Sequence, residues 1–418
     1  MHPVLFAALL VAAQVPPDSI DVPRLLTLLR ASDSTVCGLA SRALTNWGGF
    51  YWRQGEQPTP VTMPVPMPMP GAGHLEVTLD DGAWAHDHRW EDTVALGAFR
   101  GALRDENRCV RTLAARVLGQ RHAPRAYESF TGLLGDANPA YRETGAIGLG
   151  EMEDARAVRP LGVALRDRDA RVRATAAWAL GEIEDPAAIP ALASALDDDV
   201  VSVRQTAVWA LGDIEDADAI EPLTRALRDR ATDVRRMAAW ALGEIEDARG
   251  VRPLGTALAD PQPTVRRTAI WALGEIEDAS AVPLLAPLVR DRSPEVRKAA
   301  LWALGQIESA AGVSAAAVGL KDPDPEVRAL AAWALGQIED ESAVDPLAAA
   351  LKDPEIDVRV TAAWALGEIE SPEAGPPLRA ALQDESGAVR RAARWALRQL
   401  DDEDDVRVNV RPKVKVKS

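Results

Sequence analysis

Tryptophan recurs every 31 residues from residue 178 onward, and an acidic or amide side chain follows each one four residues later. The chain has 12 Trp but only 3 Tyr and 4 Phe. Indole faces bordered by carboxylates suit a cationic or basic partner, through cation–π contact and charge complementarity. We therefore predict a partner-binding row of indoles and acids. The tryptophans are Trp178, Trp209, Trp240, Trp271, Trp302, Trp333, Trp364 and Trp395, and the first four acids are Glu182, Asp213, Glu244 and Glu275.

Two other interpretations of this row stay open. The indoles could stack on sugar rings, or each could pack against its neighbour and only seal a surface. In the predicted helix 172–183, Trp178 lies roughly 145° from the centre of the apolar stripe at about 100° per residue. It is therefore not an ordinary core residue of its own helix pair. The stripe is formed by Val172, Ala176, Ala179, Leu180 and Ile183.

Ten Asp and ten Arg keep the same 31-residue spacing, each Arg six residues after its Asp. An Asp that precedes a helix can accept hydrogen bonds from its first free N–H groups. We therefore expect a structural role and not a row of catalytic carboxylates. The aspartates are Asp105, Asp136, Asp167, Asp198, Asp229, Asp260, Asp291, Asp322, Asp353 and Asp384. The arginines are Arg111, Arg142, Arg173, Arg204, Arg235, Arg266, Arg297, Arg328, Arg359 and Arg390.

Each 31-residue unit is predicted to hold two helices. In residues 185–215 the first helix spans 186–196, and Pro190 stands near its start, where a missing N–H costs little. Asp197 to Asp199 break it, and 203–214 form the second helix. A glycine recurs late in each second helix, from Gly119 to Gly367, where it permits close helix packing or eases the C-terminal turn.

Units such as DPDPEVRALAAWALGQIEDESAVDPLAAALKD resemble short HEAT repeats of the phycobilin-lyase type. The resemblance implies an all-α fold, a right-handed α-solenoid (superhelix) of about eleven two-helix repeats. It also implies that the second helices line the concave face and that the Asp and Arg form a ladder between neighbouring units. Ten repeats are predicted over 92–401, and 18–47 is a degenerate first repeat.

An irregular insertion at 48–91 separates the first repeat from the others. It contains PTPVTMPVPMPMPG, which is expected to be extended. The alternation over 74–79 and the turn signal after it are typical of a short hairpin. His86 and His88 follow Met63, Met67 and Met69, and these ligand types suit copper. An apolar docking surface is the interpretation that we adopt, and we predict no metal and no cofactor.

The N-terminus predicts export. Residues 4–13 are apolar over the length of a signal-peptide core, so 1–13 is predicted to be a signal peptide cleaved before Gln14. The alternative is a capping helix in a cytoplasmic protein. Cys37 and Cys109 occupy nearly equivalent places in the first two repeats. They could bond in an oxidising compartment, or remain free thiols.

The net charge of −16 argues against nucleic acid and anionic membranes as partners. No stretch approaches the roughly 20 apolar residues of a membrane span. Residues 402–418 form a charged tail whose valines alternate with polar residues, which is typical of an edge strand, with a disordered tail as the alternative.

Three function classes remain. The first is a non-enzymatic, monomeric scaffold that binds a protein with a basic or cationic surface, and the second is a carbohydrate- or small-ligand-binding solenoid. The third is an enzyme of the HEAT-like lyase or hydroxylase kind. The chain has no His-Glu pair, no Gly-rich phosphate loop and no GxSxG elbow, and His122 is the only histidine of the repeats. We therefore predict a scaffold and no enzyme.

Overall fold

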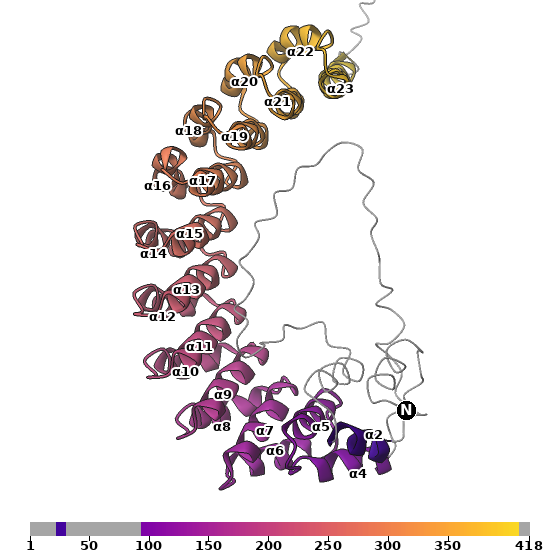
Figure 1. The fold of residues 1–418 in the computed structure, drawn as a ribbon, viewed down its shortest axis with the longest axis vertical. Helices are drawn as coiled ribbons and strands as arrows, with labels where there is room; N and C mark the ends of the chain where they lie inside the picture. Colours follow the sequence, from indigo (N-terminus) through magenta and orange to yellow (C-terminus); the bar gives the residue numbers. More distant parts are fainter. Residues whose placement is uncertain (1–21, 31–92, 409–418) are drawn as a thin grey trace, which may run out of the picture. The chain divides into compact units, whose positions relative to one another are not determined.

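The structure is a computed structural model that describes residues 22–30 and 93–408 (Figure 1). All regular elements in these ranges are helices, which confirms the all-α prediction. The signal peptide, the insertion with its hairpin and His-Met residues, and Cys37 lie outside the described residues. The chain divides into two compact units, Met1–Ala210 and Leu211–Ser418, called unit 1 and unit 2 below.

Unit 1 contains paired helices joined by short turns. The 3-10 turn Ala155–Ala157 precedes α8, and the 3-10 turn Pro186–Ala188 precedes α10. The α-helices are α2 (Val22–Arg30), α4 (Thr93–Ala102), α5 (Arg108–Gln120), α6 (Ala126–Leu134), α7 (Pro139–Gly150), α8 (Val158–Ala164), α9 (Ala170–Glu182), α10 (Ile189–Ala195) and the first part of α11 (Val201–Asp213).

Unit 2 repeats the same pairing, with short first helices in one layer and longer second helices in the other (Figure 1). The first helices are α12 (Ile220–Ala226), α14 (Val251–Ala257), α16 (Val282–Leu285), α18 (Val313–Gly319), α20 (Val344–Ala350) and α22 (Gly375–Ala381). The second helices are α13 (Thr232–Glu244), α15 (Pro263–Glu275), α17 (Pro294–Gln306), α19 (Pro325–Ile338), α21 (Ile356–Glu368) and α23 (Gly387–Val408).

Polar caps and prolines set the start of the helices. The side chain of Asp169 accepts a hydrogen bond from the N–H of Arg171 at 2.9 Å, and Asn138 caps α7 in the same way. Pro263, Pro294 and Pro325 begin three second helices. Proline has no N–H, and this costs little at the first position of a helix, because an N–H there would have no partner within the helix.

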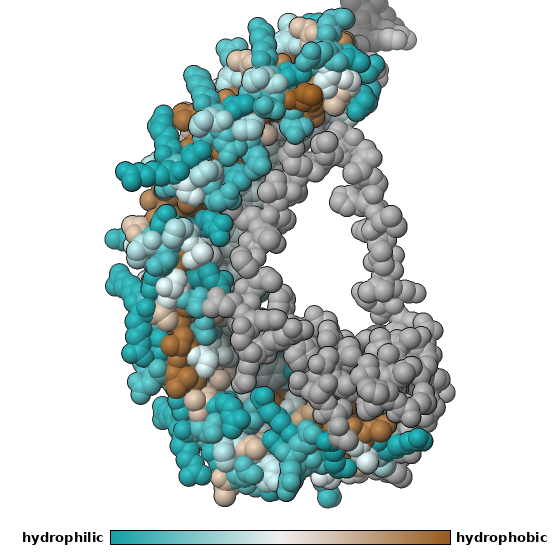
Figure 2. Space-filling model, viewed as in Figure 1, coloured by the Kyte–Doolittle hydropathy of each residue, from teal (hydrophilic) through white to brown (hydrophobic). Residues whose placement is uncertain are grey.

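Small and branched apolar residues fill the space between helices. The second helices of unit 2 pack in series from α13 to α23, and Leu, Val and Ala at their inner positions are buried. Alanine at so many inner positions lets the helices approach closely, as expected for a tightly stacked solenoid. On the face shown in Figure 2, hydrophilic residues cover most of the described surface. None of the described helices has the length and apolarity that a membrane span needs.

The last helix is longer than predicted. The repeats were expected to end at 401 and to be followed by a strand-like or disordered tail, but α23 continues to Val408. In earlier repeats a Gly-Glu-Ile-Glu segment turns the chain, whereas Arg398 and Asp401 stand at the Gly and second Glu positions here. The turn is absent, so the helix continues, and the strand prediction is wrong for residues 406–408.

One first helix is broken. Pro287 follows the four residues of α16, and residues Ala286–Arg290 form a 3-10 helix (η7) in place of a continuous α-helix. Proline lacks the N–H that an α-helix requires in its interior and its ring clashes with the preceding turn. The corresponding residue of the preceding repeat is Thr256, within the seven-residue α14.

Candidate partner-binding face

The predicted tryptophans lie at one position of successive second helices and differ in exposure. We call them the indole row. In unit 1, Trp178 and Trp209 are half-buried. In unit 2, Trp302 and Trp333 are buried at 4% and 3% exposure, whereas the others are half-buried. Two of the eight indoles are therefore inaccessible to a partner in this structure, and the half-buried members are Trp178, Trp209, Trp240, Trp271, Trp364 and Trp395.

Each indole packs on the glycine of the preceding second helix. A β-carbon built on Gly305 would lie 2.6 Å from Cζ3 of Trp333, and one built on Gly243 would lie 3.0 Å from Cζ3 of Trp271. Such contacts are closer than real side chains tolerate. The repeated glycine therefore makes room for the next repeat's tryptophan.

Where an acid follows the tryptophan, the indole can interact with it. The indole of Trp271 lowers the pKa of Glu275, and the indole of Trp364 lowers that of Glu368. In α17 the residue at this position is Gln306, and the buried Nε1 of Trp302 has no hydrogen-bond partner. The two predicted acids near the unit boundary, Glu182 and Asp213, are half-buried at the ends of their helices.

A second row of acids, which we did not predict, lies two residues further along. These turn glutamates have left-handed backbones with φ between 49° and 52°, and all are exposed. A non-glycine residue pays about 1–2 kcal/mol for this conformation. Their 31-residue spacing is visible in the sequence and could have identified them. They are Glu153, Glu184, Glu215, Glu246, Glu277, Glu308, Glu339 and Glu370.

The two acid rows form a band of negative charge in unit 2. Burial raises the pKa of Glu244, and the carboxylates of Glu275, Glu215, Glu246 and Asp213 raise that pKa further. All four of these interacting groups are acids. No cation is among the groups that raise or lower the pKa of Glu244, so a cation from outside would relieve the repulsion at this residue.

The pKa values of two further acid-row members are raised in the same way. Burial raises the pKa of Glu275, with Glu246 and Glu277 adding to it, and the indole of Trp271 opposes the shift. Near the C-terminal end, burial raises the pKa of Glu368 together with Glu339 and Glu370. The effect is therefore repeated along unit 2 and is not peculiar to one repeat.

The fold can neutralise a carboxylate at this position. In unit 1 the corresponding residue is Glu151, which is buried, ion-paired with Arg116 at 3.0 Å and hydrogen-bonded to Gln120 at 2.7 Å. Burial nevertheless raises the pKa of Glu151. Glu244 has no such cation among the described residues.

On the other side of the indoles, one helical turn before them, unit 2 has a short basic row. Arg236, Arg267 and Lys298 occupy this position in consecutive repeats and are half-buried. Lys298 forms ion pairs with Glu295 and Glu326, both at 2.9 Å. Within the described residues, neither arginine forms an ion pair or a hydrogen bond. Burial lowers the pKa of Arg236, and Asp233 opposes this shift.

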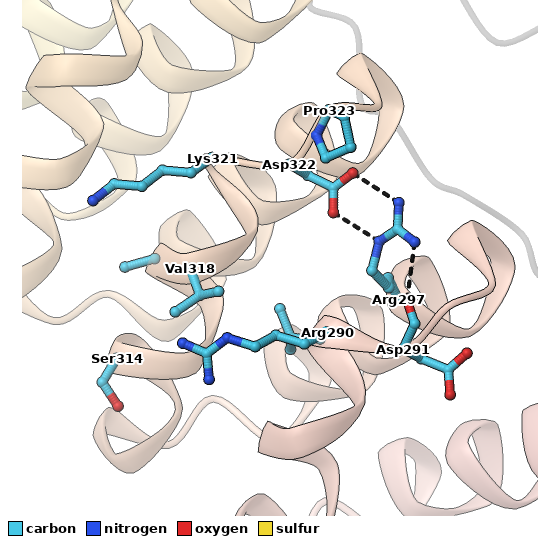
Figure 3. A pocket seen from close by; sticks show the side chains of 10 residues that line it. Arg290, Asp291, Arg297, Ser314, Val318, Lys321, Asp322 and Pro323 are labelled. Atoms are coloured by element: carbon cyan, nitrogen blue, oxygen red, sulfur yellow. Dashed lines mark hydrogen bonds and ion pairs between the residues drawn. The ribbon is translucent and has the colours of Figure 1, made fainter.

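The Asp–Arg ladder has the structural role that we expected. Arg297 donates through Nε and Nη2 to the carboxylate of Asp322 in the next repeat, at 2.7 and 2.8 Å, and through Nη1 to the backbone carbonyl of Asp291 at 3.0 Å (Figure 3). Asp322 also accepts the N–H of Asp324 at the start of α19. The same forward pairing is found for Arg142–Asp167, Arg173–Asp198, Arg235–Asp260, Arg328–Asp353 and Arg359–Asp384.

Among the described residues, the forward pairing is absent at two places. Asp136 binds Arg104 instead of Arg111, and the second missing rung lies beside η7. In the described part of the chain, Arg266 keeps its bond to the carbonyl of Asp260 at 2.9 Å but forms no ion pair with Asp291. Asp291 directly follows η7, where Pro287 changes the path of the chain. This missing rung thus coincides with the broken first helix that ends just before Asp291.

A cavity of about 570 Å³ lies between η7 and α18. Arg290 extends across it toward Ser314 and Val318, on the side away from the Arg297–Asp322 pair (Figure 3). This cavity contains none of the indoles or acids of the rows described above. The described residues also contain no cluster of three His, Cys, Asp or Glu side chains suited to a metal ion.

The repeated helix pairs match a known family. The family model of HEAT repeats matches residues 128–205, 201–260, 251–318 and 313–398. The chain belongs to the HEAT-repeat family. The phycobilin-lyase subtype remains a prediction for this HEAT-repeat chain. No protein of curated function matches it.

Solved HEAT-type structures share its fold. Importin beta is 16% identical, with a TM-score of 0.54, over 74% of this chain and 52% of importin beta. Kap95p in complex with RanGDP is 16% identical, with a TM-score of 0.53, over 73% and 51%. The HEAT-repeat chain thus matches about half the length of either. Human deoxyhypusine hydroxylase is 28% identical over 61% of this chain and 99% of its own, but a TM-score of 0.29 supports no functional argument.

Proposed function

We propose that this HEAT-repeat chain is a non-enzymatic scaffold that binds a protein partner with basic side chains through the half-buried members of the indole row and the acid band of unit 2. The observation that carries the proposal is the surroundings of Glu244, in which every interacting charged group is another acid. Bringing a cation to this place would relieve the repulsion. The half-buried indoles beside it offer cation–π contact.

A basic peptide tests the proposal. We expect a fluorescent ten-residue oligolysine to bind the full chain with an affinity that falls as salt rises. Glu244→Gln combined with Glu275→Gln should weaken binding about two- to thirtyfold, since exposed charge pairs contribute about 0.2–1 kcal/mol each.

The matched control removes two charges from the first-helix side. Asp345 and Glu341 are exposed at α20 and its preceding turn. Asp345→Asn combined with Glu341→Gln changes the net charge equally and should leave the affinity unchanged. Equal weakening by both pairs would show that only net charge matters and would contradict the proposal.

We also propose that the protein is exported. Cys109 is disulfide-bonded, and Cys37 is the only other cysteine of the chain. Disulfides persist in oxidising compartments and are rare in the cytosol, which supports export. Mass spectrometry of the protein from its native source under non-reducing conditions should show a Cys37–Cys109 cross-link and an N-terminus at Gln14. Free thiols and an intact residue 1 would contradict this proposal.

A further inference from the structure

The face of α13 and α15 carries both signs of charge, in separate rows. Arg236 precedes Trp240 by four residues, and Glu244 follows it by four. The same order is repeated by Arg267, Trp271 and Glu275 on the adjacent helix, and all six side chains are half-buried. At about 100° per residue, each set of three stays within roughly 80° of arc, so it shares one helix face.

Neither end of this face forms an ion pair among the described residues, although Asp233 interacts electrostatically with Arg236. The two arginines form no ion pair or hydrogen bond there, and the charged groups that interact with Glu244 are acids. Lys298 provides an internal comparison, because the next repeat has a cation at the same position and two glutamates that pair with it. At the corresponding positions each arginine has one acid instead of two, Asp233 for Arg236 and Glu295 for Arg267. Neither arginine forms an ion pair with that acid among the described residues.

We propose that α13 and α15 bind an extended peptide segment that carries an acidic side chain, an apolar side chain and a basic side chain at alternate positions. The acidic group would lie on the arginines, the apolar group on the indoles, and the basic group on the glutamates. This inference rests on the proposed function and adds an anionic group to the partner.

The dimensions of the face agree with this segment. Eight helical residues separate Arg236 from Glu244, which corresponds to about 12 Å along the axis, with Trp240 midway. In an extended chain, residues i, i+2 and i+4 point to the same side, and i and i+4 are about 13 Å apart. Packed helices lie about 8–10 Å apart, so the second arginine and glutamate can bind a second copy of the motif.

The test uses four fluorescent peptides and the full chain. The first contains two copies of Asp-Ser-Leu-Ser-Lys joined by a Gly/Ser linker, with blocked ends. In the second every Asp is Lys, in the third every Lys is Asp, and in the fourth every Leu is Ser. We expect the first peptide to bind at least fivefold more tightly than each of the others.

Two double variants test whether the arginines bind the acidic group and the glutamates bind the basic group of the peptide. Arg236→Gln with Arg267→Gln should abolish the preference for the first peptide over the all-basic one. Glu244→Gln with Glu275→Gln should abolish the preference over the all-acidic one. Lys298→Gln removes a cation from the same row but one that is already paired, so it should leave both preferences unchanged. Circular dichroism of each variant checks that the helices are retained.

The outcomes separate this inference from the proposed function. If the wild-type protein binds the all-basic peptide as tightly as the mixed one, the basic-partner proposal stands and the present inference is overturned. If the mixed peptide does not bind at all, the inference is also overturned. Loss of preference in the Lys298→Gln variant would show that the arginines are not the anion site.

Discussion

The Trp302 indole in α17 packs directly against Gly274 in α15. A β-carbon built on Gly274 would lie 2.7 Å from Cζ3 of Trp302 and 3.2 Å from the Cα and Cβ of Ala303. The glycine is thus required by a side chain 28 residues later, in the next repeat, and not by its own backbone, which keeps an ordinary helical conformation.

Replacing this glycine should destabilise unit 2. We expect Gly274→Ala to lower the free energy of unfolding by about 1–3 kcal/mol, because the new methyl group overpacks the interface between α15 and α17. Gly132 in α6 is the control, since a β-carbon there would meet nothing within 4 Å. Gly132→Ala should be neutral or stabilising by about 0.5–1 kcal/mol. Urea unfolding measures both changes, and equal losses would contradict the explanation.

A hydrogen-bond acceptor for Trp302 should stabilise the fold. Its buried Nε1 has no hydrogen-bond partner, whereas the indoles of Trp271 and Trp364 each interact with a glutamate at the next turn. We expect Gln306→Glu to raise the free energy of unfolding by about 1 kcal/mol at neutral pH. Gln337→Glu is the control. Among the described residues, the Nε1 of Trp302 is a buried atom that lacks a hydrogen-bond partner, and the Nε1 of Trp333 is not. A gain for Gln337→Glu that equals or exceeds that for Gln306→Glu would refute this prediction.

The ladder should make stability depend on pH. The hydrogen bond from Arg235 holds the pKa of Asp260 below its ordinary value and, with the N–H of Gln262, outweighs the opposing effect of burial. A carboxyl whose folded-state pKa is lowered stabilises the fold above its unfolded pKa of about 4. This contribution is lost as the pH falls through the folded-state pKa.

Asp260→Asn should therefore cost about 2–3 kcal/mol at pH 7, because the arginine side chain is mostly buried and loses its partner. The difference from wild type should shrink as the pH falls below about 4, since the wild-type carboxyl is then being protonated. Asp291→Asn serves as the control, because Asp291 has the same ladder position without a paired arginine. A pH-independent cost for Asp260→Asn would argue against the ion pair as its cause.

Removing the proline of η7 should restore the missing rung. We expect Pro287→Thr, which introduces the residue found in the preceding repeat, to lengthen α16 and to stabilise unit 2 by about 1 kcal/mol or more. Part of this gain should come from a new Arg266–Asp291 pair. In a double-mutant cycle with Asp291→Asn, that part should disappear. Hydrogen exchange of the amides after residue 287 should slow in the single variant, and unchanged exchange would contradict the proposed cause.

The repeat itself could be predicted because every copy has the same local signals. Asp before a second helix, Arg six residues later and apolar residues at helical spacing locate the helices, and the ladder pairs Arg297 with Asp322 as its spacing indicated. The sequence suggested that the repeated glycines allow close helix packing, but it did not show that each one contacts a tryptophan. The structure was needed for that, because the tryptophan belongs to the next repeat.

Differences between repeats could not be predicted from the spacing. Arg266 and Asp291 stand in register, yet they do not pair, and the helix between them is broken at Pro287. Trp302 is buried and Trp271 is half-buried at the same position, since exposure depends on the neighbouring repeats. The turn glutamates were missed because a left-handed backbone is normally assigned to glycine or asparagine.

The paired arginines of the ladder bind toward the C-terminal side, and this arrangement does not fix the number of repeats. At the N-terminal side Asp105 accepts a bond from Arg30 of α2, and each later Arg that is paired reaches forward to the Asp of the next repeat. Among the described residues, Arg390 near the C-terminal side bonds only to carbonyls of its own repeat. Duplicating one whole 31-residue unit would therefore supply one new donor and one new acceptor together. Gene duplication could lengthen or shorten such an array while keeping the numbers of donors and acceptors equal.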